Sequence, residues 1–237
     1  MLITIKPKPF IALLLSLVIS FLLSFGLYRI TKVDAIARFS YTIVVDAGHG
    51  GRDAGASGIN TGAKESDINL SIAKKLQQYL SDFGFNVVMT RQNQDGLYSQ
   101  NVSNYKKDDM AKREKIIEKN KPNMLISIHQ NSYSTISEKG AQSFYEQTNE
   151  LSKNLSECIQ NQLINNLPNA RKNCNKGDYF LLKNKTIPCS IVECGFLSNP
   201  DEESLLITED YQQKVAYAIF CGVINYLNNY EWINYTN

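Results

Sequence analysis

Short apolar runs alternate along this chain with longer amphipathic segments, and that alternation constrains the fold more than any other feature. The run YTIVVD at 41–46 is typical of a buried strand. The segment 66–84 instead repeats apolar residues at steps of three and four and stops at Gly84, which is typical of a helix. Both patterns recur downstream. The predicted strands are 41–46, 85–90, 124–129 and 141–146, with further apolar runs at 179–182 and 190–194, and the predicted helices are 66–84, 107–120, 149–167 and 208–230.

Strands separated by helices predict an α/β fold, with an open, mostly parallel sheet of about six strands and helices on both faces. About 200 residues are enough for one well-packed domain. No segment of 20–50 residues repeats, and no low-complexity linker divides the chain. We therefore expect a single domain over residues 41–237.

The N-terminal segment 1–37 has a different character. Residues 10–28 contain no charged side chain and follow Lys6 and Lys8, which favours a cytoplasmic N-terminus. A stretch of 19 residues is just long enough to cross a bilayer, so the segment is predicted to be an uncleaved membrane anchor. A cleaved signal is the alternative, because Ala35 and Ala37 form an A-x-A site, and a buried core helix is the third possibility. Either of the first two predicts export of residues 41–237.

Charge and cysteine content argue against three classes of protein. The chain carries a formal net charge of +2, and residues 1–37 hold four of its basic and one of its acidic side chains. The remainder is therefore close to neutral, which argues against a nucleic-acid partner. The five cysteines are an odd number without a C-x-x-C pair, so neither a disulfide framework nor a zinc knuckle is predicted.

Four polar residues stand at strand ends or helix starts, where α/β sheets bind their ligands. His49 follows the first predicted strand, Glu65 precedes the first helix, His129 ends the third strand, and Glu193 ends the run at 190–193. Two imidazoles and one carboxylate are a common zinc ligand set that leaves a position for water. A further carboxylate off the metal is the usual general base.

Each of these residues also has a simpler interpretation. The glycine-rich loop around His49 resembles a phosphate cradle, although it lacks GxxxxGK[ST]. His129 is equally compatible with a hydrogen-bonded core histidine, and Glu65 with an acid at a helix N-terminus. Glu193 is harder to explain as structural, because burying a carboxylate costs several kcal/mol unless a partner compensates it.

Four ordered motifs carry a resemblance to a known family. VVDAGHGGRDAGASG, KESDINL, LISIHQNS and IVECGFLSNPDE resemble the zinc-dependent N-acetylmuramoyl-L-alanine amidases, over about residues 41–229. The resemblance implies an α/β fold, zinc held by His49, Glu65 and His129, and a catalytic role for Glu193. The implied substrate is peptidoglycan, a glycan strand with stem peptides, cut between the muramic acid lactyl group and L-alanine. Two departures from the family pattern are Gln130 in place of Ala, and Ile117-Glu118 in place of Ala-Asn.

Within the family, a membrane segment followed by a lone catalytic domain resembles the germination-specific amidases, which act on spore cortex glycan as a step towards muramic-δ-lactam. An accessory protein is a possible further partner. The alternatives are a wall amidase of growth and division, a wall cysteine peptidase pairing Cys194 with His129, and an inactive wall-binding module.

Four further residues are expected near the site. Asp46 is expected to orient a ligand histidine. Arg91, Arg113 and Asn131 either line the groove or are solvated.

Overall fold

The computed structural model describes residues 15–24 and 41–231, and it divides into two units, Met1–Ser40 and Tyr41–Asn237. In the first unit, residues 15–24 form a helix with exposed side chains. Among the described residues, no helix is long and apolar enough to span a bilayer. Residues 10–14 and 25–28 of the predicted anchor or signal lie outside the described residues, and so does the A-x-A site.

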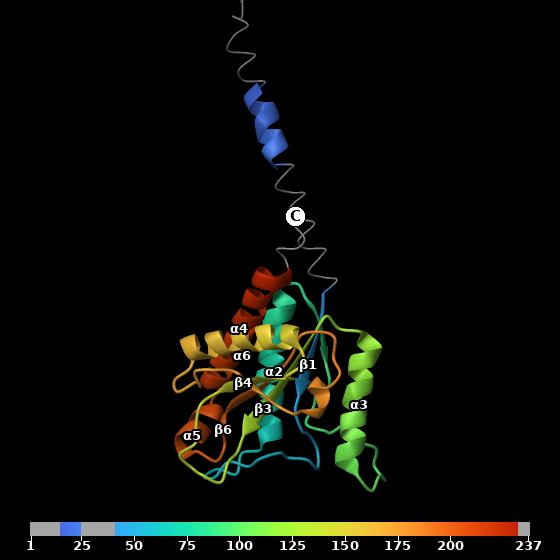
Figure 1. Ribbon diagram of the computed structural model, residues 1–237, viewed down its shortest axis with the longest axis vertical. Coiled ribbons are helices and arrows are strands. Elements are labelled where there is room, and N and C mark those ends of the chain that lie inside the picture. The colour runs from blue at the N-terminus through green and yellow to red at the C-terminus, as the bar shows by residue number, and fades with distance from the viewer. Residues whose placement is uncertain (1–14, 25–40, 232–237) are drawn as a thin grey trace, which may run out of the picture. The chain divides into compact units, whose positions relative to one another are not determined.

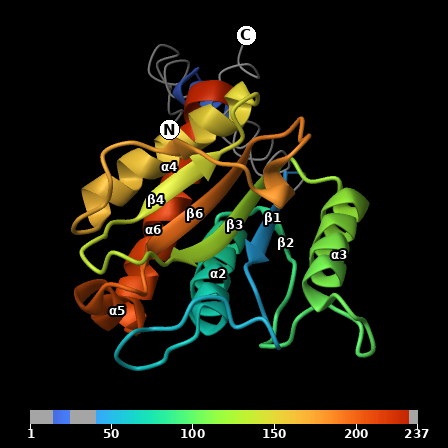
Figure 2. The ribbon, with the colours of Figure 1, turned by 60° about the horizontal axis from the view of Figure 1, so that its bottom comes forward.

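The second unit is built on a six-stranded sheet in the order β2-β1-β3-β6-β4-β5 (Figures 1 and 2). Strands β2, β1, β3 and β6 are parallel to one another, and β4 runs antiparallel to β6. The prediction of a mostly parallel α/β sheet is therefore confirmed. The strands are β1 (Thr42–Ala47), β2 (Asn86–Met89), β3 (Met124–Asn131), β4 (Gln142–Tyr145), β5 (Asn175–Lys176) and β6 (Cys189–Phe196).

Helices cover both faces of the sheet, as predicted, because the central strands are apolar on both sides. Val45, Ile126 and Val192 belong to a large core with α2, α4 and α6. Their neighbours Val44, Leu125 and Ile191 belong to a smaller core on the other face, with α3 and the 3-10 turn η1. The helices are α2 (Glu65–Asp82), α3 (Tyr105–Asn120), α4 (Glu150–Asn166), α5 (Pro200–Leu206) and α6 (Glu209–Tyr226), with η1 at Phe180–Leu182 and a π-helical turn η2 at Leu227–Glu231.

Three local elements differ from the sequence-based expectation. The apolar run at 179–182 forms η1 rather than extended structure, and its Leu181 and Leu182 fill the smaller core. The sixth strand is instead the two-residue β5, whose exposed Asn175 and Lys176 carry no apolar signal. The short helix α5 was not predicted, although Asn199 caps it and Pro200 occupies its first turn.

Candidate metal centre

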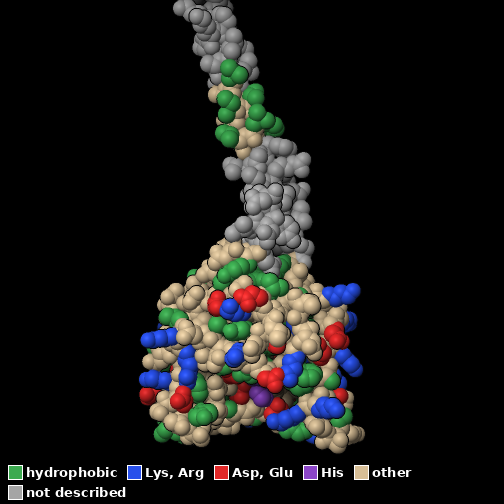
Figure 3. Space-filling model, in the orientation of Figure 1, with side chains coloured by type: hydrophobic (Ala, Val, Ile, Leu, Met, Phe, Trp, Pro, Cys, Tyr) green, Lys and Arg blue, Asp and Glu red, His purple; other side chains and the backbone are tan. Residues whose placement is uncertain are grey.

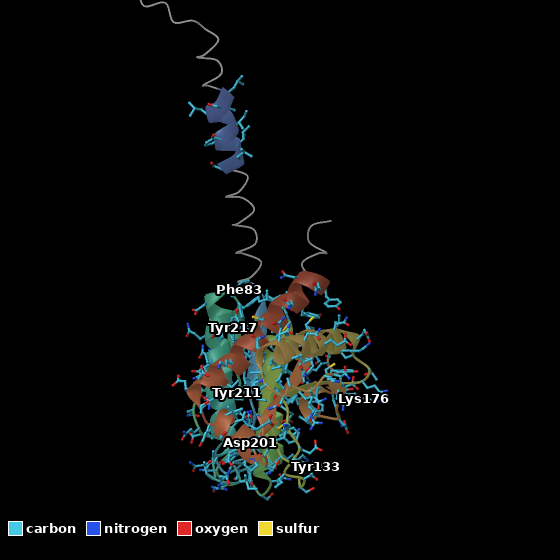
Figure 4. The ribbon with its side chains drawn as sticks, turned by 90° about the vertical axis from the view of Figure 1, so that its left-hand side faces the viewer. Phe83, Tyr133, Lys176, Asp201, Tyr211 and Tyr217 are labelled. Carbon is cyan, nitrogen blue, oxygen red and sulfur yellow. The ribbon has the colours of Figure 1, made fainter. Side chains whose placement is uncertain are left out.

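The four predicted site residues come from four elements that meet at the carboxyl ends of the parallel strands. His49 follows β1, Glu65 is the first residue of α2, and His129 and Glu193 are paired in register on β3 and β6. Figure 4 shows this end of the domain at the bottom, where Tyr133 beyond β3 and Asp201 beyond β6 both lie. Parallel strands thus bring together residues that are far apart in the sequence.

His49, Glu65 and His129 form a compact group. Oε1 of Glu65 lies 3.2 Å from Nε2 of His49 and 3.0 Å from Nδ1 of His129. The two imidazole rings stand edge to face, with 5.0 Å between their centroids, and the three ligand atoms all lie within 4.8 Å of one another. Two ligands about 2 Å from a tetrahedral zinc ion are separated by roughly 3.3 Å, so the two distances from Glu65 suit one such ion.

The charges in this group are matched to a cation. Burial alone would raise the pKa of Glu65, but hydrogen bonds to His129 and His49 hold it well below its usual range. Burial alone would lower the pKa of His49, yet Glu65 and Asp53 together raise it to about 9. Both effects place positive charge where the three ligand atoms converge. A divalent cation bound there would supply the same charge and displace the extra proton of His49.

Asp53 orients His49. Nδ1 of His49 lies 2.8 Å from Oδ2 of Asp53, a pairing in which the imidazole donates because an ionised carboxylate only accepts. The other ring nitrogen, Nε2, is thereby directed at Glu65. Lys106 Nζ lies 3.0 Å from the second oxygen of Asp53 and fixes that carboxylate in turn. Metal-binding histidines usually have such an acceptor on the outer nitrogen.

The prediction that Asp46 orients a histidine is wrong. This fully buried carboxylate accepts hydrogen bonds from Thr90 Oγ1 at 2.7 Å, Ser127 Oγ at 2.5 Å and Arg113 Nη1 at 2.6 Å. Burial alone would raise the pKa of Asp46, but Arg113 and the two hydroxyls lower it to about 2. Asp46 therefore acts as the buried counter-ion of Arg113.

Two arginines hold the loop that carries His49. Arg91 donates to the carbonyls of Ala47 and Gly48 at 2.9 and 3.0 Å, and Arg113 to those of Ala47 and His49 at 2.7 and 2.6 Å. These bonds fix His49 in the left-handed region at a φ of 62°, which few residues other than glycine adopt. The alternative of solvated arginines is wrong, since both side chains are buried. Neither donates to the ligand side chains.

Glu193 lies beside the group and is nearly buried, with 8% of its surface exposed. Its Oε2 has no hydrogen-bond partner among the described residues. Burial raises the pKa of the Glu193 carboxyl, against the opposing effect of His129, and the Tyr179 side chain hydrogen-bonds to it. A buried carboxylate with an unused oxygen is suited to accept a proton from a water molecule.

Gln130 stands where the family pattern has alanine, and it supports Glu65. Its backbone N–H donates to Oε1 of Glu65 at 3.1 Å, and its side-chain amide donates to Oδ1 of Asn69 at 3.0 Å. Asn69 in turn donates to the same Glu65 oxygen at 3.2 Å. The Gln130 side chain therefore contacts Asn69, which itself helps to hold Glu65.

The site opens to solvent through a pocket of about 250 Å³, whose walls come from the β1–α2 loop, the first half of α3 and residues 179–181. Figure 3 shows a histidine at the surface between acidic side chains in the lower part of the domain. Asn131 is not among the residues that line this pocket, so the expectation that it lines the groove is not met.

Cys194 does not serve this site. Successive side chains of a strand point to opposite faces, and Cys194 points into the large core, where it is fully buried. Burial also raises the pKa of the Cys194 thiol far above its usual value. A buried, protonated thiol is a poor nucleophile, so the cysteine peptidase alternative is wrong.

A group of two histidines and one glutamate, beside a carboxylate with one free oxygen, is typical of metal-dependent hydrolases. Within that class, this chain belongs to the N-acetylmuramoyl-L-alanine amidase family, whose model matches residues 43–225. Membership carries the family's activity on peptidoglycan, the hydrolysis of the N-acetylmuramoyl–L-alanine amide. The resemblance drawn from the four sequence motifs is thereby confirmed.

Individual relatives support the same assignment. The chain is 36% identical over 188 residues to a germination-specific N-acetylmuramoyl-L-alanine amidase of Bacillus subtilis, and the match spans 78% of each chain. The CwlD amidase of Clostridioides difficile, solved in complex with the GerS lipoprotein, superimposes with a TM-score of 0.76 at 38% identity. That match covers 80% of this chain and 99% of the other. The catalytic domain of CwlV from Paenibacillus polymyxa superimposes with a TM-score of 0.70 at 30% identity, over 79% and 98%.

Proposed function

We propose that the chain performs this hydrolysis as a zinc enzyme, with His49, Glu65 and His129 as the ligands. The observation that carries the proposal is the convergence of three ligand atoms, with nitrogen-to-oxygen distances of 3.0 and 3.2 Å. When bound there, zinc supplies a Lewis acid for the lactyl carbonyl and lowers the pKa of a water molecule towards about 7.

Glu193 moves the proton in this proposal. Its free Oε2 accepts a proton as water attacks the lactyl carbonyl carbon. The amide C–N bond then breaks, and Glu193 delivers the proton to the L-alanine nitrogen, which leaves as a neutral amine rather than an amide anion. Tyr179 hydrogen-bonds to the same carboxylate. Asp53 keeps His49 in the tautomer whose Nε2 is free to bind metal.

The proposed biological substrate is spore cortex glycan, in which removal of the stem peptide is a step towards muramic-δ-lactam. The germination-specific relative from Bacillus subtilis supports this choice over a role in growth and division. The CwlD amidase was solved with a lipoprotein, which supports a protein partner for this chain as well. Residues 1–37 are proposed to direct export or to anchor the catalytic unit outside the cytoplasmic membrane.

Mass spectrometry of purified glycan tests the activity and the substrate together. Incubation with the full chain and zinc is expected to release stem peptides that begin with L-alanine and to leave glycan with free lactyl groups. Equal turnover of vegetative wall and cortex glycan would favour the growth and division alternative. Release that is unaffected by removing zinc with a chelator would overturn the zinc mechanism.

Export has a separate test. Protease added to protoplasts of cells expressing the chain is expected to degrade residues 41–237. Full protection of the catalytic unit in intact protoplasts, with degradation after lysis, would contradict export.

A further inference from the structure

A second cavity adjoins the pocket over the metal-binding group. It has a volume of about 670 Å³ and lies between the second half of α3 and residues 180–187. Phe180 lines both this cavity and the pocket over the site, so the two are neighbours on either side of that side chain. We call the pair the α3 groove. Figures 1 and 2 both show α3 standing at one side of the sheet, apart from the other helices.

One face of α3 forms a wall of the whole groove. In its first half, Asp109, Met110 and Arg113 line the pocket over the site. In its second half, Glu114, Ile117 and Glu118 line the second cavity. These positions follow one another at steps of one and three, which is a single stripe along an α-helix.

The length of this wall suits a short extended peptide. The stripe begins at Lys106 beside the metal-binding group and ends at Lys121, just beyond the helix. Fifteen residues of helix rise about 22 Å. An extended chain advances about 3.3–3.6 Å per residue, so the groove has room for roughly six residues.

The floor of the second cavity is apolar, and its rim carries charges of both signs. Ile117, Phe180 and Ile187 contribute apolar surface. Glu118 and Lys121 are exposed at the rim, and neither has an ion-pair partner among the described residues. An ion pair between Lys185 and Glu114 links the two walls and fixes their separation. A ligand with both carboxylate and ammonium groups would match this rim, whereas a neutral sugar chain would leave its charges unused.

We infer that the α3 groove binds the stem peptide of the substrate. This inference rests on the proposed function, because the scissile amide must lie over the metal-binding group while the peptide leaves along some path from it. The two neighbouring cavities follow one face of α3 away from that group and offer such a path. Lys121 is positioned to attract the carboxylates of an acidic peptide, and Glu118 the free ammonium of a diamino acid. Phe180 lies between the two cavities. It packs against the middle of the peptide, between the peptide's reacting end and the charged groups at the peptide's far end.

Binding of the free peptide tests this inference without requiring turnover. The ligand is L-alanyl-γ-D-glutamyl-diaminopimelyl-D-alanine, titrated calorimetrically into the zinc-loaded full chain, and a peptide-free oligosaccharide of the same glycan is titrated in parallel. Lys121→Glu and Phe180→Ala are each expected to weaken peptide binding by roughly three- to tenfold, because an exposed ion pair or a half-exposed aromatic contact is worth about one such factor. Neither variant should affect oligosaccharide binding.

The matched control is Lys74→Glu. It makes the same charge change at an exposed lysine in another cavity, between α2 and α6, on the opposite face of the sheet. Peptide affinity should be unchanged in this variant. The inference is overturned if the wild-type chain does not bind the peptide, if Lys74→Glu weakens it as much as Lys121→Glu does, or if the groove variants weaken oligosaccharide instead. Failure of the proposed function is distinguishable, since it would appear as intact peptide binding without cleavage of whole glycan.

Discussion

Replacing Arg113 by methionine tests whether a buried ion pair holds the loop that presents His49. Arg113 is 1% exposed and donates to Asp46 and Asp109 at 2.6 Å each, and to the carbonyls of Ala47 and His49. Methionine fills much of the same volume but leaves the fully buried Asp46 without its cation. Breaking a buried pair in this way costs about 3–5 kcal/mol, which is a large part of the ~5–15 kcal/mol that stabilises a typical domain.

The sign of the pH dependence should also reverse. In the wild-type fold the pKa of Asp46 lies at about 2, below its ordinary 3.8. A group with a lowered folded pKa stabilises the fold above its unfolded pKa, and that contribution is lost as pH falls from about 4 towards 2. Without Arg113, burial should instead raise the pKa of Asp46. The buried charge then destabilises the fold at neutral pH, and mild acidification should recover part of the loss.

Urea denaturation followed by circular dichroism, with zinc held in constant excess, measures both effects. Lys112→Met is the control on the same helix, because Lys112 forms a partly exposed pair with Asp108 and should contribute less than about 1 kcal/mol. The double variant Asp46→Asn with Arg113→Met should be more stable than Arg113→Met alone. A loss below about 1 kcal/mol in Arg113→Met, or no gain in the double variant, would refute this account of the loop.

Three further substitutions test the site. Glu193→Gln should retain zinc and fold but lose at least about a hundredfold in turnover, since a general base contributes ~10²–10⁴-fold. Near wild-type turnover in a glycan digestion assay would remove Glu193 from the mechanism. Asp53→Asn should weaken zinc binding by about 10–100-fold in a competition titration, because the outer nitrogen of His49 loses its charged acceptor. Unchanged zinc affinity would show that His49 needs no such partner. Gln130→Ala should lower the free energy of unfolding, measured by thermal denaturation, by no more than about 1.5 kcal/mol. Only the side-chain hydrogen bond to Asn69 is lost, while the backbone hydrogen bond to Glu65 remains. A loss of zinc would contradict this supporting role of Gln130.

The central strands and the convergence of the site were predictable from the sequence for the same reason. The strands β1, β3 and β6 are buried on both faces, so each contains a mainly apolar run with a polar site residue at or shortly after its end. Parallel strands bring those ends to one edge, which places His129 opposite Glu193. The resemblance of the motifs then separated the roles of Glu65 and Glu193, which their positions alone left open.

The supporting contacts were not predictable, because they depend on tertiary distances. Asp53 lies four residues after His49 in a loop, and no periodic pattern shows which acid turns toward the imidazole. Asp46 was the more conspicuous candidate, yet Arg113 reaches it from a helix 67 positions away. The reversal of β4 and the two-residue β5 likewise follow from edge pairing that leaves no hydrophobic signal in the chain.

The most direct test of the metal centre is the zinc content of the full chain, measured by elemental mass spectrometry after removal of free metal. We expect one zinc per wild-type chain and little or none in His129→Ala, because a site that loses one of three protein ligands no longer meets the coordination that zinc requires. Glu193→Gln serves as the control and should keep one zinc. Unchanged stoichiometry in His129→Ala would contradict the assignment of His49, Glu65 and His129 as the ligands.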